Sequence, residues 1–209
     1  MRVALYGATG RAGSRILKEL VARGHHVVAL TREPQSASED ANVEWRVDDL
    51  SDEAHIARAI QGADAVISAY APPQDNTDAL VMVCQRLAQA VQQSHIPRLL
   101  VVGGAGSLEV APGVTLLQSG MLPPEWVPIA ASHSKALDAL KATSINWTYV
   151  APAAMFEPGK RTGTYRTDRT KLLTDARGES RISMEDYAIA MVDELERPSH
   201  PRERFAVAW

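Results

Sequence analysis

Three glycines near the start of the chain, spaced G-x-x-G-x-x-G, constrain the possible folds more than any other feature. The segment consists of Gly7, Ala8, Thr9, Gly10, Arg11, Ala12 and Gly13. It directly follows an apolar run at residues 3–6, and apolar residues then recur at helical spacing from Arg11 to Arg23. A buried strand, a tight glycine turn and a helix are therefore predicted in succession, as at the start of a Rossmann-type βαβ unit.

A glycine turn in this context is suited to binding a pyrophosphate. Glycine has no Cβ, so a phosphate can approach the backbone closely. The free amides and the positive end of the helix then attract the anion. We therefore predict that Gly7 to Gly13 bind a nicotinamide dinucleotide. The alternative is a glycine-rich turn without a ligand, and the flanking strand and helix disfavour it.

Strand and helix patterns alternate along the rest of the chain. Strands are predicted at residues 26–31, 43–47, 64–69, 98–102, 147–150 and 204–208, and helices at 52–60, 75–94, 129–142 and 183–196. Residues 105–127 are predicted to form a long loop, and residues 162–174 a two-stranded segment. Ser51 and Ser183 are predicted helix caps. The alternation indicates an α/β fold, a single Rossmann-type domain over residues 1–209 with a doubly wound parallel sheet and helices on both faces.

Composition limits the possible partners. The 209 residues carry a net charge of −3, which gives no general attraction to nucleic acid or to an anionic membrane. The single cysteine, Cys84, excludes an intrachain disulfide and is expected to be a buried thiol. We see no signal-peptide pattern, membrane-spanning stretch or metal-ligand spacing, and predict a cytoplasmic protein without a metal. A small-molecule acceptor is the expected partner, and a homodimer is possible.

The end of the second strand bears on which dinucleotide is bound. In NAD-specific Rossmann proteins an acidic residue there binds the ribose 2′-hydroxyl. Here the strand is followed by Arg32, whose guanidinium suits a 2′-phosphate, and Arg11 in the glycine loop is placed to assist. NADP(H) is therefore preferred over NAD(H). Glu33 keeps the NAD alternative open, and a solvated surface charge is the other reading of Arg32.

Further candidate site residues follow the other strands, because ligands bind at the carboxyl ends of parallel strands. Asp49 is predicted either at the adenine edge or as a helix cap. The remaining cofactor candidates are Ser68, Ala69, Tyr70, Gly103, Gly104 and Pro152. The substrate pocket is expected to be formed largely by residues 103–175. Tyr70 and His133 are weak catalytic candidates. An exposed helix histidine is the favoured reading of His133, and core or loop packing is favoured for Tyr70, Met155 and Phe156.

Several motifs together resemble a known family. They are Gly7-Ala8-Thr9-Gly10-x-x-Gly13, Thr31-Arg32, Asp48-Asp49, Ser68-Ala69-Tyr70, the run from Val101 to Leu108 and the run from Arg181 to Ala188. The chain resembles, over essentially its whole length, the atypical short-chain dehydrogenases named NADH-flavin reductases. That group is related to flavin reductase/biliverdin-IXβ reductase and to NmrA-like proteins. The resemblance implies NAD(P)H binding and hydride transfer to a flavin or a similar acceptor.

The chain departs from its relatives at the acid–base positions. Ordinary short-chain dehydrogenases use Tyr-x-x-x-Lys, but Ala131 stands four residues before Lys135. The serine and histidine of the flavin/biliverdin reductase correspond to Gly104 and Ala153. Flavin reduction is compatible with these losses, because the cofactors carry the chemistry and the protein orients them.

Two functions therefore remain. The first is an NADPH-dependent reductase of a flavin or a quinone-like acceptor, with the flavin as substrate. The second is a non-enzymatic NADP(H)-sensing protein of the NmrA-like kind. A sugar-nucleotide epimerase is disfavoured, because such enzymes normally need the tyrosine and a larger C-terminal domain.

Overall fold

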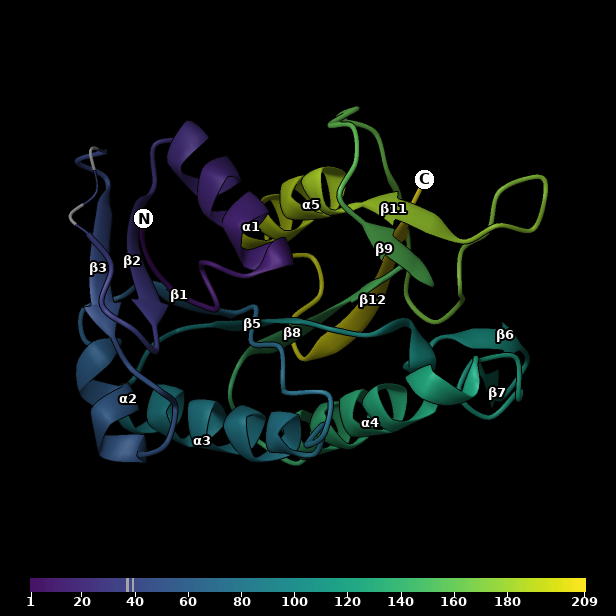
Figure 1. Cartoon of the computed structure of the whole chain (residues 1–209), viewed down its shortest axis with the longest axis horizontal. Helices are drawn as coiled ribbons and strands as arrows, with labels where there is room; N and C mark the ends of the chain where they lie inside the picture. Colours follow the sequence, from purple (N-terminus) through teal and green to yellow (C-terminus); the bar gives the residue numbers. More distant parts are fainter. Residues whose placement is uncertain (37, 39) are drawn as a thin grey trace.

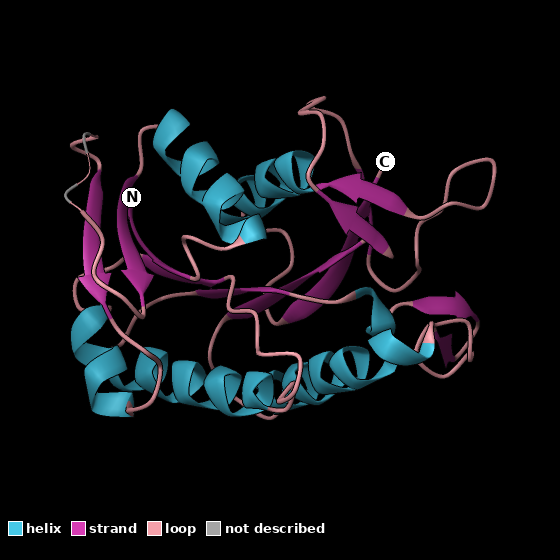
Figure 2. Ribbon diagram, in the orientation of Figure 1, coloured by secondary structure: helices cyan, strands magenta, loops and turns pink. Residues whose placement is uncertain are grey.

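An eight-stranded sheet forms the central layer of the fold (Figures 1 and 2). The computed structural model describes residues 1–36, 38 and 40–209. The strands are β1 (Arg2–Tyr6), β2 (His26–Thr31), β3 (Val43–Val47), β4 (Ala65–Ser68), β5 (Leu99–Val102), β8 (Trp147–Pro152), β10 (Arg166–Asp168) and β12 (Glu203–Ala208). Their order is β10-β12-β8-β5-β4-β1-β2-β3. Every neighbouring pair is parallel except β10 with β12, which confirms the predicted α/β sheet.

Helices cover both faces of the sheet, as predicted. On one face lie α1 (Arg11–Ala22) and α5 (Met184–Glu196), and on the other lie α2 (Glu53–Ala59), α3 (Ala79–Gln93) and α4 (Val127–Lys141) (Figure 1). Each face has its own buried apolar cluster. None of the described helices has the length and apolarity needed to cross a membrane.

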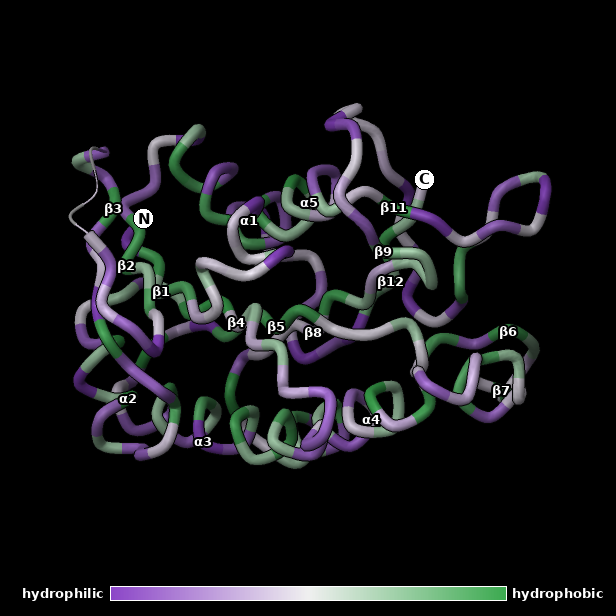
Figure 3. Tube along the Cα trace, in the orientation of Figure 1, coloured by the Kyte–Doolittle hydropathy of each residue, from purple (hydrophilic) through white to green (hydrophobic). Residues whose placement is uncertain are grey.

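The first strand shows why apolar runs form the centre of this sheet. Residues 3–6 are all buried, and successive side chains point to opposite faces. Val3 and Leu5 join the cluster under α1 and α5, whereas Ala4 and Tyr6 join the cluster under α2, α3 and α4. A strand covered on both faces needs a continuous apolar run, not an alternating one. Figure 3 shows the resulting hydrophobic stretch along β1.

The second half of the chain is more ordered than predicted. Residues 105–127 are not a plain loop, because they contain the short helices η1 (Ala105–Ser107) and η2 (Pro124–Trp126) and the hairpin of β6 (Glu109–Ala111) and β7 (Val114–Thr115). Residues 162–174 do not form a two-stranded unit, because only β10 lies there and it pairs with β12. A second small sheet, of β9 (Met155–Glu157) and β11 (Arg181–Ser183), was not predicted.

The helix starts correct three further predictions. Asp52, not Ser51, caps α2, since its side chain accepts a hydrogen bond from the His55 amide at 2.9 Å. Helix α3 begins at residue 79 instead of 75, and α4 begins at residue 127 instead of 129. Ser183 caps α5 as predicted, accepting from the Asp186 amide at 3.0 Å.

Asp186, in the first turn of α5, forms hydrogen bonds with two segments that are distant in the sequence. Its carboxylate is fully buried. It accepts hydrogen bonds from the amides of Thr162 and Gly163 at 2.8 and 2.9 Å, from the Thr162 hydroxyl at 2.5 Å and from the Trp209 indole at 2.7 Å. The loop before β10 and the residue after β12 are thereby held against the start of α5.

Candidate functional site

The glycine loop lies where the order of the strands reverses. From β1 the chain proceeds to β2 and β3 on one side, and later to β4 and β5 on the other. The segments that follow β1 and β4 meet in the gap: a Cβ on Gly7 would lie 2.4 Å from the carbonyl oxygen of Ala69. Gly7 also has φ +73°, which favours glycine. This reversal point at the carboxyl ends of the strands is where open α/β sheets bind ligands.

The other two glycines bring α1 close to the loop. A Cβ on Gly13 would lie 2.0 Å from the Gly7 carbonyl oxygen, which is far inside contact distance, and a Cβ on Gly10 would lie 3.1 Å from it. The Gly10 amide donates to the same oxygen at 2.9 Å. Packing therefore requires glycine at residues 7 and 13 of the G-x-x-G-x-x-G motif. The requirement is weaker at residue 10.

The start of α1 presents an anion-binding surface. Its N-cap residue is Gly10, no side chain caps the helix among the described residues, and its first turn has no acidic residue. The first amides of a helix have no partner within the helix, and they carry the positive end of its dipole. With no Cβ in the way, this backbone fits a pyrophosphate.

Arg32 and Tyr70 face the same crevice from the ends of β2 and β4. Burial raises the pKa of the half-buried Tyr70 phenol, and the nearby charge of Arg32 opposes that rise. Arg32 is exposed, as is Glu33, whose backbone carbonyl accepts from the Thr31 hydroxyl at 2.7 Å. Arg32 and Tyr70 thus follow the two strands that flank β1, and they lie near enough for the Arg32 charge to act on the Tyr70 phenol.

The end of β4 and the residue after it lie beside the glycine loop. Ser68, the last residue of β4, is buried, and Ala69 is 8% exposed. The Ala69 amide donates to the carbonyl oxygen of Tyr6 at 3.0 Å. These residues adjoin the crevice through their backbone, since their side chains are small and covered.

At the end of β3 the buried carboxylate is Asp48, which was not among the site candidates. It accepts from the Leu50 amide at 2.7 Å, and burial raises its pKa. Asp49 is exposed and accepts from the Ser51 amide at 2.9 Å, so it is not the cap of α2. The doublet Asp48-Asp49 was the only signal in the sequence, and it does not say which member is buried.

Gly103 and Gly104, after β5, make room for two aromatic side chains. A Cβ on Gly103 would lie 2.3 Å from the Tyr149 ring, and one on Gly104 would lie 2.9 Å from the His133 ring. Tyr149 lies on β8 and is fully buried, and no sequence motif indicated that it contacts the end of β5. His133 lies on α4, so α4 and β8 both contribute side chains to the end of β5.

His133 is not the solvent-exposed helix residue that was favoured. Its ring is partly buried, and Nδ1 lies 3.0 Å from the Tyr149 hydroxyl oxygen. The Gly104 amide donates to that same oxygen at 3.0 Å. Burial lowers the pKa of His133 to about 4 and raises that of Tyr149, so both side chains are neutral at pH 7.

Other residues near the sequence motifs differ in their surroundings. Pro152 is the last residue of β8, at the carboxyl end of the strand and not after it, and it is buried. Phe156 packs on Tyr187 with ring centroids 4.7 Å apart, which supports its reading as packing. Lys135 pairs with Asp78 at 3.0 Å, both largely exposed. The described residues contain no group of three or more potential metal ligands.

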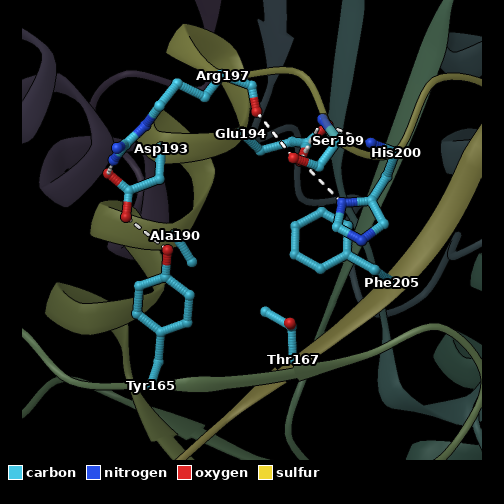
Figure 4. A pocket seen from close by; sticks show the side chains of 9 residues that line it. All are labelled: Tyr165, Thr167, Ala190, Asp193, Glu194, Arg197, Ser199, His200 and Phe205. Carbon is cyan, nitrogen blue, oxygen red and sulfur yellow. Dashed lines mark hydrogen bonds and ion pairs between the residues drawn. The ribbon is translucent and has the colours of Figure 1, made fainter.

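A cavity of about 300 Å³ lies elsewhere, along α5 and β12 (Figure 4). Of the residues that line it, only Tyr165 and Thr167 fall within 103–175. Another, Asp193, accepts from the Tyr165 hydroxyl and pairs with Arg23, which follows the C-terminal end of α1. The glycine loop is at the opposite end of α1, so this cavity does not adjoin it.

Comparison with known proteins agrees with the geometry. The sequence profile of a family described as NAD(P)H-binding matches residues 7–198. A Burkholderia pseudomallei structure, proposed to be an exported protein, is 42% identical, with a TM-score of 0.92 and 100% of both chains covered. A Bacteroides thetaiotaomicron structure, proposed to be an epimerase, is 39% identical, with a TM-score of 0.92 and coverage of 100% of this chain and 96% of that one.

A third solved structure, from Streptococcus pneumoniae, is of a protein proposed to be an NADH-flavin reductase. It is 34% identical, with a TM-score of 0.90, and the match covers 100% of this chain and 99% of the other. The family profile begins at Gly7, the first residue of the loop that closes on Ala69. Loop geometry, fold and sequence thus agree, and the chain belongs to this family of NAD(P)H-binding proteins.

Proposed function

We propose that the protein is an NADPH-dependent reductase that transfers a hydride to a flavin or a quinone-like acceptor. The observation that carries the proposal is the uncapped start of α1, packed by Gly7 and Gly13 into the strand reversal point. The similarity to the Streptococcus protein proposed to be an NADH-flavin reductase supports the choice of acceptor.

Each part of the crevice then has a role. The backbone from Gly7 to Gly13 holds the pyrophosphate. Arg32, with Arg11, binds the 2′-phosphate, while Asp49 lies toward the adenine. The backbone of Ser68, Ala69 and Tyr70 runs beside the ribose, and Gly103, Gly104 and Pro152 border the nicotinamide. When bound, the nicotinamide supplies the hydride, and these residues orient it.

The structure favours reduction of a conjugated acceptor over alcohol–ketone chemistry. In ordinary short-chain dehydrogenases a lysine assists the tyrosine that exchanges a proton with the substrate. Here the tyrosine position is Ala131, and Lys135 is paired with Asp78 on the surface. Epimerase chemistry, as proposed for the Bacteroides relative, has the same requirement, so we favour the reductase.

Cofactor preference is tested by titrating NADPH and NADH into the wild type and Arg32→Ala. A charge-assisted contact to phosphate contributes about 1.5–3 kcal/mol, so Arg32→Ala should weaken NADPH binding roughly tenfold or more and leave NADH binding unchanged. Glu33→Ala, an exposed neighbour, is the matched control and should retain the preference. Equal affinities for the two dinucleotides in the wild type would refute the NADPH assignment.

The reaction is tested by following the loss of nicotinamide absorbance with FMN, riboflavin and a set of quinones. Turnover with one of these classes supports the reductase. Tight NADPH binding without turnover of any acceptor would instead favour the NADP(H)-sensing alternative. That alternative predicts partner proteins captured on the immobilised chain only when NADPH is present.

We also propose a cytoplasmic location, based on the lone buried Cys84. The name of the Burkholderia relative points the other way, so fractionation of cells that express the full chain is the deciding test. Sedimentation of the purified protein tests whether it forms a homodimer.

A further inference from the structure

The partly buried His133 and the buried Tyr149 form a polar pair at the same edge of the sheet as the glycine loop. The edge is shared because β5 and β8 run parallel to β1 and β4, and the loop after each of these strands emerges at its carboxyl end. The His133 ring lies against Gly104, the second residue after β5. None of the roles assigned above uses either side chain.

The hydrogen bonds around Tyr149 favour one tautomer of the His133 ring. The phenol oxygen accepts from the Gly104 amide at 3.0 Å, so its own proton is free to be donated. Two acceptors lie within reach: Nδ1 of His133 at 3.0 Å and the His133 carbonyl oxygen at 3.2 Å. In an α-helix that carbonyl already accepts from the amide four residues on. Donation to Nδ1, the nearer acceptor, places the proton of the neutral ring on Nε2.

The second ring nitrogen is left for a ligand. Nε2 has no hydrogen-bond partner within the part of the chain that the structure describes, and it is not sealed from solvent. Burial holds both side chains in their neutral forms at pH 7. His133 thus offers a fixed, uncharged N–H at the carboxyl edge of β5.

We propose that His133 donates this Nε2–H hydrogen bond to a carbonyl oxygen of the acceptor, and that Tyr149 is the positioning residue that fixes its tautomer. The inference rests on the proposed reductase function and narrows it to acceptors with a carbonyl conjugated to the reduced atom. As the nicotinamide is oxidised and the hydride brings two electrons to the acceptor, negative charge collects on that oxygen. The N–H stabilises this charge, and the completing proton comes from water, so His133 keeps its own proton.

The first test uses variants that separate the donor from the ring. His133→Phe keeps an aromatic ring without a donor, whereas the amide of His133→Gln places a nitrogen donor near the position of Nε2. We expect His133→Phe to lower kcat for flavin or quinone roughly 100-fold, as losing one donor to a developing oxyanion does, with NADPH affinity unchanged. His133→Gln should retain most of the rate. Ser134→Ala, on the next residue of α4, is the control.

The second test is independent of turnover. Nitrogen-15 NMR of the histidine side chains in the full chain reports which ring nitrogen is protonated. We expect Nε2–H in the wild type, and a mixture of tautomers with a reduced kcat in Tyr149→Phe. An Nδ1–H ring in the wild type would overturn the inference whatever the activity.

The remaining outcomes separate this inference from the proposed function. Wild-type turnover that survives His133→Phe unchanged overturns the role of His133 and leaves the reductase intact. A wild type that binds NADPH but reduces no acceptor overturns both. If His133→Phe binds NADPH more weakly in proportion to its lost rate, the residue serves the cofactor instead, and the inference is again overturned.

Discussion

At the scale of single residues, the contact between Gly13 and the Gly7 carbonyl governs the candidate site. Gly13→Ala would place a methyl group 2.0 Å from that backbone oxygen, whereas Gly10→Ala would place one at 3.1 Å. We expect Gly13→Ala to cost about 2–3 kcal/mol of stability and to weaken dinucleotide binding roughly tenfold or more. Gly10→Ala, the matched control for packing, should cost clearly less stability. Thermal unfolding and NADPH titration measure the two effects of Gly13→Ala, and equal destabilisation by the two substitutions would contradict this account of the loop.

Some residues of the candidate site could be predicted from the sequence, and others could not. The glycine loop was predictable because seven consecutive residues carry its spacing and its flanking strand and helix. The pairing of His133 with Tyr149 was not, since it joins a helix to a strand 16 residues later through a hydrogen bond. Likewise, Asp48 and Asp49 differ in burial only because the chain turns after β3, and adjacent identical residues contain no signal of that turn.

At the scale of elements, Asp186 couples the start of α5 to the loop at residues 162–163 and to Trp209. Burial alone would raise its pKa, but the hydrogen bonds outweigh that effect and lower it. Asp186→Asn should therefore cost about 3 kcal/mol at pH 7, because charge-assisted bonds are lost in a buried site. A carboxylate with a depressed folded pKa stabilises the fold above its ordinary pKa, and this contribution disappears as the pH falls through the folded value.

Urea unfolding at several pH values measures this contribution. The difference in unfolding free energy between wild type and Asp186→Asn should narrow as the pH falls below about 4, the ordinary pKa of an aspartate, because the unfolded chain then takes up a proton at residue 186 while the folded chain, with its lowered pKa, does not. Asp175→Asn, in an exposed turn, is the control and should change stability much less. A difference that stays constant down to pH 3 would show that the charge of Asp186 is not what stabilises the segment.

The elements that the sequence failed to predict share a physical cause. β10 is the polar sequence Arg166-Thr167-Asp168, and β9 and β11 have three residues each. Segments so short carry too few residues for a period of two to be recognised. β10 is a strand because it pairs with β12, and β9 and β11 pair with each other, so these strands depend on contacts between segments that are separate in the sequence. The apolar strands β1, β2 and β5, by contrast, were predicted to within a residue.

At the scale of the whole molecule, a ligand that binds only the folded chain must stabilise it. NADP⁺ at 100 times its Kd should add about 2.7 kcal/mol and raise the Tm by roughly 5–10 °C for a domain of this size. Riboflavin alone should raise it less, because its proposed site is completed by the bound dinucleotide. Differential scanning fluorimetry with each ligand is the measurement. No shift with either dinucleotide would contradict the cofactor assignment for the entire crevice.

The position of β12 has a consequence for how the protein is made. This strand lies between β8 and β10 in the sheet but leaves the ribosome after both. Until it is synthesised, the edge of β8 remains unpaired, and every residue of β8 is one that the finished fold buries. An unpaired apolar edge is a template for wrong pairing with other chains. The nascent polypeptide is therefore most prone to aggregation just before translation of β12, and premature termination there should yield an insoluble product.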